Sequence, residues 1–131
     1  MYTMMQVCRE LDMTYQTLKF YCNEGLVPNV KRDHNNRRVF DEKDVKWIKD
    51  LTCLKKCGMS IQEMKKYLEL CLQGEATIVS RKKMLARKQE ELRASIKELE
   101  DSISYIGWKQ NFYDEVLSGK RPYVSNLIRT A

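Results

Sequence analysis

A short polar stretch near the start of the chain, residues 14–19, carries hydroxyl groups and an ammonium group at helical spacing. Such side chains at the N-terminal end of a short helix can reach base edges in a DNA major groove and the phosphates beside it. A basic loop follows, and its adjacent arginines can hold flanking phosphates. The residues that this pattern assigns to DNA contacts are Thr14, Tyr15, Thr17, Lys19, Arg37 and Arg38.

The same stretch has a plainer interpretation, in which Thr14 only caps a helix and Tyr15 is only a surface aromatic. Two neighbouring features favour DNA binding. The stretch leads into Gly25-Leu-Val-Pro28, which stops a helix and turns the chain, and the arginine pair follows soon afterwards. A short helix reached through a tight turn and followed by a basic loop is typical of a helix-turn-helix protein with a wing.

Four short helices are predicted in the first half of the chain, each from its own start signal. The expected N-cap residues are Thr3, Thr14, Asp41 and Ser60. The second helix, from about Tyr15 to Cys22, carries the polar stretch. Between the second and third helices, residues 27–40 are rich in Asn and basic residues, and we expect a β-hairpin there. Asn35-Asn36 suits its turn, because Asn tolerates left-handed backbone angles.

After Gly74 the pattern becomes that of one long helix. From Ile78, apolar residues recur every seven positions, and from Ile96 a second series fills the alternate seam position. An amphipathic helix of this length cannot bury its seam against itself, so we expect it to pair with a second copy as a coiled coil. The predicted dimerisation residues are Leu85, Leu92, Ile96, Leu99, Ile103 and Ile106.

Length and composition set limits on the kind of protein. The chain has 131 residues, a net charge of +6 and a pI near 9.1, which is compatible with a polyanionic partner. No stretch approaches the roughly 18 apolar residues of a membrane span, and Arg9, Glu10 and Asp12 interrupt any signal peptide. We therefore expect a cytoplasmic protein that contacts no membrane and whose five cysteines are mostly reduced.

Two segments resemble the MerR family of bacterial transcription regulators. Residues 17–28, Thr-Leu-Lys-Phe-Tyr-Cys-Asn-Glu-Gly-Leu-Val-Pro, resemble its T-L-R-Y-Y-E-x-x-G-L-x-P pattern, and Asn36-Arg-Arg-Val-Phe40 resembles G-Y-R-x-Y. The resemblance is close over residues 2 to about 72. After these residues it extends only to the presence of a long helix. It implies that Lys19, Tyr21 and Arg38 contact DNA phosphates or brace the groove-reading helix.

The chain departs from this pattern at several positions. Lys19 replaces Arg, Phe20 replaces Tyr, Cys22 replaces Glu, and Asn36-Arg37 replaces Gly-Tyr. Phe20 lacks the hydroxyl group that could contact a phosphate, whereas Arg37 adds a positive charge to the wing. None of these changes argues against the fold.

The cysteines indicate what such a regulator could sense. Metal-responsive members need thiolates at the start of the long helix and in a loop after it, but no cysteine follows Cys71 and the single histidine is His34. The residues after the coiled coil are too few for the ligand domain of multidrug members. No metal site, cofactor or enzymatic centre is expected, since the chain also lacks a Gly-rich phosphate loop and a histidine-assisted nucleophile.

Cys53 lies in Cys53-Leu-Lys-Lys-Cys-Gly-Met-Ser60, which resembles the C-L-x-x-[TN]-G-M-S segment of the NmlR/AdhR-like aldehyde- and nitrosative-stress branch. The resemblance implies that this thiol reacts with small electrophiles. Nearby lysines favour the reactive thiolate. Alternatively, Cys53 is inert and packs the third helix. Of the other thiols, Cys8 and Cys71 lie on apolar faces, and Cys22 is a surface residue or a second redox group.

The predicted fold is therefore mostly α: a winged helix-turn-helix domain of four helices and a small hairpin at residues 1–74, an antiparallel coiled-coil helix at residues 75–118 and a short tail at residues 119–131. The resemblance implies a homodimer that binds a pseudo-palindromic promoter and distorts its spacer so that RNA polymerase can engage it. Two alternatives stay open: an effector-independent repressor or architectural DNA binder of the same fold, and a coiled-coil adaptor that binds protein.

Overall fold

Short helices and three two- or three-residue strands build the first part of the protein, in a computed structural model that describes residues 1–129. In chain order the elements are β1 (Tyr2–Thr3), α1 (Met4–Leu11), α2 (Tyr15–Asn23), β2 (Lys31–Arg32), β3 (Arg38–Phe40), α3 (Glu42–Lys56), α4 (Ile61–Leu72), the 3₁₀ turn η1 (Glu75–Thr77) and α5 (Ile78–Leu117). The chain divides into one unit that covers Met1–Gln89 and a second that begins at Glu90.

The four predicted helix starts are confirmed. The side chains of Thr3, Asp41 and Ser60 each accept a hydrogen bond from a backbone N–H three residues later, and each forms a reciprocal capping box. Thr14 Oγ1 accepts the N–H of Thr17 at 3.1 Å. Because these bonds join residues three positions apart, they depend only on local sequence.

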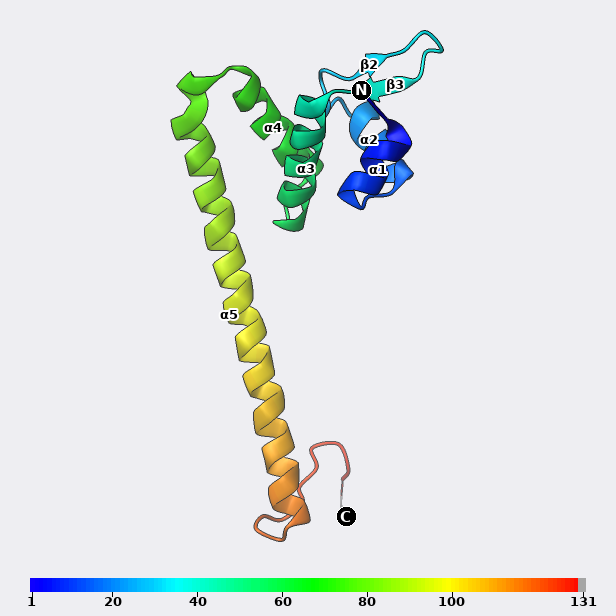
Figure 1. Cartoon of the computed structure of the whole chain (residues 1–131). Helices are drawn as coiled ribbons and strands as arrows, with labels where there is room; N and C mark the ends of the chain where they lie inside the picture. The colour runs from blue at the N-terminus through cyan, green and yellow to red at the C-terminus, as the bar shows by residue number, and fades with distance from the viewer. Residues whose placement is uncertain (130–131) are drawn as a thin grey trace. The chain divides into compact units, whose positions relative to one another are not determined.

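α1 and α2 form the helix-turn-helix, and the β2–β3 hairpin extends away from them as the wing (Figure 1). The turn between the helices places Asp12 in the left-handed region, with φ at 51°. In the wing, Asn36 has φ at 61°, as expected for the predicted hairpin turn. The Asp33 carboxylate accepts hydrogen bonds from the backbone N–H groups of Asn35 and Arg37, which closes the loop.

The sequence prediction missed the third strand. β3 is the middle strand and pairs antiparallel with both β1 and β2. Tyr2 lies opposite Phe40, so the start of the chain is joined to the wing. A strand of two residues is too short to show alternation in the sequence, which is why β1 was not predicted.

The hydrophobic core of the first unit lies where α1, α2, β3, α3 and α4 meet. Its largest fully buried side chains are Phe40, Leu18, Leu26, Ile48, Leu51, Met59, Met64 and Val7. Trp47 of α3 adds a polar link, because its Nε1–H donates to the carbonyl oxygen of Leu26 at 2.7 Å. The core therefore holds α2 and α3 together, and the Trp47 hydrogen bond ties α3 to Leu26, which follows α2.

α5 is continuous through Gly107 and ends before Gly119, whose φ of 84° stops the helix. None of its described residues is buried. The predicted dimerisation residues are exposed, from 39% at Leu85 to 69% at Ile103. Their pairing with a second copy stays a prediction. The division into a DNA-binding domain that ends at residue 74 and a dimerisation helix that begins at residue 75 also stays a prediction. Among residues 1–129, no helix is long and apolar enough to cross a bilayer.

Candidate nucleic-acid interface

α2 turns one face to the core and the other to solvent. Leu18 and Tyr21 are buried, whereas Tyr15, Lys19 and Phe20 are exposed. This division leaves the N-terminal part of the helix available to a partner. α2 is called the reading helix below.

The structure brings the start of the reading helix and the wing to a common groove. Tyr15 lines this groove together with three wing arginines, Arg32, Arg37 and Arg38, and with the first residues of α1. The concave groove is lined by three arginines and one acidic residue, Asp33, and this excess of positive charge suits the phosphate backbone of DNA. Arg32 was not assigned to the site from the sequence, although it precedes the predicted turn by only a few residues.

Two of these arginines also hold the wing in place. Arg38 Nη2 donates to Asn23 Oδ1 at 2.6 Å, which joins the middle strand to the end of the reading helix. Arg32 Nη1 donates to the carbonyl oxygen of Asn36 at 2.9 Å and stabilises the hairpin loop. Arg37 is exposed, as Arg32 is, and it also lines the groove. Arg32 and Arg38 thus stabilise the wing through hydrogen bonds within the fold.

Thr14 and Tyr21 have clear local roles. Thr14 caps the reading helix and its hydroxyl group donates to Thr17 Oγ1 at 2.8 Å, so the capping role is present in the structure. Tyr21 is only 3% exposed, and burial raises the pKa of its hydroxyl group. It lines a shallow depression together with Thr14, Thr17 and Phe20. This position suits bracing of the helix from within.

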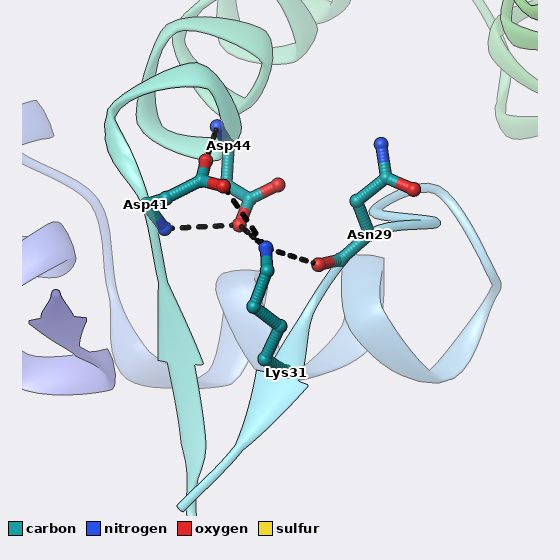
Figure 2. Close-up of polar contacts among 4 residues, drawn as sticks. All are labelled: Asn29, Lys31, Asp41 and Asp44. Atoms are coloured by element: carbon teal, nitrogen blue, oxygen red, sulfur yellow. Dashed lines mark hydrogen bonds and ion pairs between the residues drawn. The ribbon is translucent and has the colours of Figure 1, made fainter.

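The base of the wing is locked to α3 by Lys31, as Figure 2 shows. Lys31 Nζ lies 2.9 Å from the Asn29 carbonyl oxygen, 3.0 Å from Asp41 Oδ2 and 3.3 Å from Asp44 Oδ2. Asp44 is 4% exposed and also accepts the backbone N–H of Asp41 at 3.0 Å. A buried carboxylate requires such partners. One basic residue of the predicted DNA-binding loop is thus used within the fold.

The five cysteines differ in accessibility. Cys8 is buried, Cys22, Cys57 and Cys71 are half-buried, and Cys53 is exposed on α3. Burial raises the pKa of the Cys8 and Cys22 thiols. The structure therefore leaves Cys53 as the thiol most open to solvent. In the described part of the chain, His, Cys, Asp and Glu form no group of three or more that could hold a metal ion.

Comparison with known proteins decides the family. Residues 2–71 match the model of the MerR HTH family of regulatory proteins, and residues 45–106 match the MerR DNA-binding model. The chain belongs to the MerR family of DNA-binding transcriptional regulators. The fold agrees, since a small winged domain precedes a long C-terminal helix.

Three family members show how similar this chain is to known proteins in sequence and in structure. An HTH-type transcriptional regulator of Haemophilus influenzae is 33% identical over 87% of this chain and 84% of its own length. The Bacillus subtilis regulator AdhR is 37% identical over 66% of this chain and 62% of its own length. The crystal structure of HiNmlR, a MerR family regulator lacking the sensor domain and bound to promoter DNA, has a TM-score of 0.72 at 32% identity, covering 89% of this chain and 93% of that one.

In this MerR family member, the lock at the wing base predicts a pH-dependent contribution to stability. The Asp44 backbone N–H and, next, the Lys31 ammonium group lower the pKa of Asp41. A lowered folded-state pKa stabilises the fold above the ordinary value near 4, and the contribution is lost as pH falls through the folded value. We therefore expect Asp41→Asn, which keeps a capping oxygen, to lower Tm at pH 7, and the difference from wild type to shrink below about pH 4.

Thermal unfolding followed by circular dichroism between pH 7 and pH 3 measures this effect. Asp50→Asn is the matched control, because it removes the same charge from an exposed position on α3. An equal Tm loss in both variants, or a difference that does not change with pH, would contradict the role of the lock.

Proposed function

We propose that this regulator binds promoter DNA as a homodimer, acts on transcription together with RNA polymerase, and is switched by covalent modification of Cys53. The observation that carries the DNA part is the shared groove of the reading helix and the wing, where Tyr15 lies beside Arg32, Arg37 and Arg38. The promoter-bound HiNmlR structure, at 32% identity, supports the choice of DNA over a protein partner.

The two parts of the interface have different tasks in this proposal. Thr14, Tyr15, Thr17 and Lys19 meet base edges and adjacent phosphates from the exposed start of the reading helix. The wing arginines meet phosphates, which position the protein without reading the sequence. Tyr21 acts from within the domain, by holding the reading helix against the core.

Self-association is supported by the exposed seam of α5. Leu92, Ile96 and Leu99 are 40%, 55% and 64% exposed, and Ile103 and Ile106 continue the same heptad pattern. Exposed apolar residues at this spacing pair in coiled coils. The seam therefore predicts a second helix of the same kind against it.

The charges of α5 favour an antiparallel pair. Residues 81–88 carry five basic side chains and no acidic one, whereas residues 90–117 carry seven acidic and three basic side chains. A parallel pair would place the two basic segments side by side, which like-charge repulsion disfavours. An antiparallel pair places each basic segment beside acidic residues of the other copy.

Family membership and the proposed dimer support promoter distortion as the mode of action. Two reading helices related by a two-fold axis fit two half-sites of a pseudo-palindromic operator. Bending or untwisting the spacer costs a few kcal/mol, which phosphate contacts can offset. We propose that this distortion brings the promoter elements into register for RNA polymerase.

The sensor role of Cys53 is supported by its place on α3. The thiol is exposed, and it lies four residues before the turn that joins α3 to α4. Lys88 of α5 reaches this turn, with Nζ 3.5 Å from the Gly58 carbonyl oxygen and 3.3 Å from Glu63 Oε2. A modification of Cys53 that moves the turn would thus change the contacts of Lys88 near the start of the long helix.

Removal of a wing charge should weaken DNA binding in a salt-dependent way. Arg37→Ala is expected to raise Kd for promoter DNA about tenfold and to reduce the slope of log K against log salt by about 0.9, because one phosphate contact is lost. Fluorescence anisotropy at several salt concentrations measures both values.

Lys97→Ala on α5 is the control for Arg37→Ala, because it removes one exposed positive charge far along the sequence from the wing. Equal effects of the two variants would show a response to net charge only. If the wild-type protein bound no DNA in a salt-dependent way, a coiled-coil adaptor would become the better explanation.

A charge in the α5 seam should dissociate the dimer. Leu99→Glu places a carboxylate at an apolar seam position, and burying it unpaired costs more than the contact contributes. Sedimentation equilibrium should give the dimer mass for wild type and a monomer-shifted mass for the variant. Lys97→Glu lies off the seam and should stay dimeric; a monomeric wild-type protein would overturn the homodimer.

Replacement of the sensor thiol should separate signalling from DNA binding. Cys53→Ser is expected to bind promoter DNA as the wild type does and to lose the transcriptional response to an aldehyde or a nitrosating agent. That response is measured by in vitro transcription from a long-spacer promoter, taken from the region upstream of this protein's own gene. Cys71→Ser is the control. If wild type and Cys53→Ser respond equally, or neither responds, an effector-independent regulator of the same fold is the better account.

A further inference from the structure

Cys53 and Cys57 form a pair of accessible thiols at the C-terminal end of α3. Cys53 is exposed and Cys57 is half-buried. Cys57 is the C-cap residue, and its backbone N–H donates to the Cys53 carbonyl oxygen at 3.1 Å. This hydrogen bond places the two residues one helical turn apart, so their side chains lie on the same face of the helix.

The spacing of this pair disfavours a disulfide. One helical turn separates Cβ atoms by about 5–6 Å, whereas a disulfide requires a separation of about 3.8 Å. One further atom bonded between the two sulfurs lengthens the bridge and fits the turn without unwinding it. Such an atom must be soft and must form two bonds to sulfur, because thiolates prefer soft partners.

We propose that Cys53 and Cys57 are a dithiol site for a trivalent arsenical, held as a single arsenic atom bridging the two sulfurs of one helical turn. The proposal rests on the sensor role proposed for Cys53 and names the chemical class of an effector. It adds Cys57 to the site as the second ligand.

The reaction involves no net oxidation or reduction. An organoarsenic(III) oxide reacts with two thiols, two arsenic–sulfur bonds replace the bonds from arsenic to oxygen, and the two thiol protons leave with that oxygen as one water molecule. Arsenic stays trivalent and both sulfurs stay at the thiol oxidation level. No oxidant or other co-reactant is needed.

The pair is distinct from the other thiols of the chain. Cys8, Cys22 and Cys71 belong to α1, α2 and α4, and no other two cysteines stand within four positions of one another in the sequence. Cys8 is also buried. A bridging ligand that needs two accessible thiols on one turn therefore selects Cys53 and Cys57.

A bridge at this place acts on the turn between α3 and α4. It ties Cys57 covalently to Cys53, and Cys57 is followed directly by Gly58 and Met59. The Met59 N–H donates to the Leu54 carbonyl oxygen at 3.2 Å, and its side chain is 1% exposed in the core. Lys88 of α5 lies beside the Gly58 carbonyl oxygen. The bridged state therefore restrains the end of α3 next to residues that contact the core and Lys88 of α5.

The test uses the full, reduced protein with phenylarsine oxide as the probe. Intact-mass spectrometry and a thiol titration should show one phenylarsenic group and two lost thiols per chain in the wild type. With excess glutathione as competitor, Cys53→Ser and Cys57→Ser should each retain the probe at least about 100-fold more weakly, because chelation by two tethered thiols is lost. Cys71→Ser and Cys22→Ser are the matched controls and should retain it as tightly as wild type.

Each other outcome overturns the dithiol site. Unchanged retention in Cys57→Ser would show that Cys57 is not a ligand, and loss in Cys71→Ser or Cys22→Ser would place the arsenic elsewhere. Thermal unfolding of each variant should match wild type, which separates ligand loss from misfolding. The sensor role is tested separately. If the transcriptional response to an aldehyde persists in Cys53→Ser, Cys53 is not the sensor, even if retention of the arsenical still requires both thiols.

Discussion

The burial of Phe40 fixes how the wing, the reading helix and α3 lie against one another. Phe40 is fully buried at the end of the middle strand, where it lies opposite Tyr2 of β1. Arg38, two residues earlier on the same face of the strand, reaches Asn23 of the reading helix. Asp41, the next residue, caps α3. The burial of one aromatic side chain thus positions the wing and two helices.

The basic residues of the first unit serve two purposes, and hydrogen-bond partners within the fold distinguish them. Lys31 is tied to Asp41 and Asp44, and Arg38 is tied to Asn23, so both stabilise the wing. Arg37 and Lys19 are exposed and can meet DNA. A wing that must hold its shape against a polyanion needs both kinds of cation, because a flexible loop would pay an ordering cost on every binding event.

The α3–α4 turn connects the thiol chemistry with the architecture. It follows Cys53 and Cys57, contributes Met59 to the core, and contacts Lys88 of α5. Lys55 and Ile61, on either side of it, line the depression beside Tyr21 of the reading helix. The end of α3 therefore lies next to residues that contact α5 and residues that line a depression shared with α2.

The sequence by itself determined the local features of this protein. The helix caps, the left-handed turn at Asn36 and the uninterrupted α5 depend on residues a few positions apart, so their patterns are readable from the chain. The MerR family was equally readable, from residues 17–28 and 36–40. The tertiary structure alone decided the strand β1, the place of Arg32 in the groove, and the use of Lys31 within the wing. It also decided that Tyr21 faces the core. These features depend on residues brought together by core packing from distant positions. No local pattern encodes which basic side chains find partners within the fold or which aromatic side chains are buried.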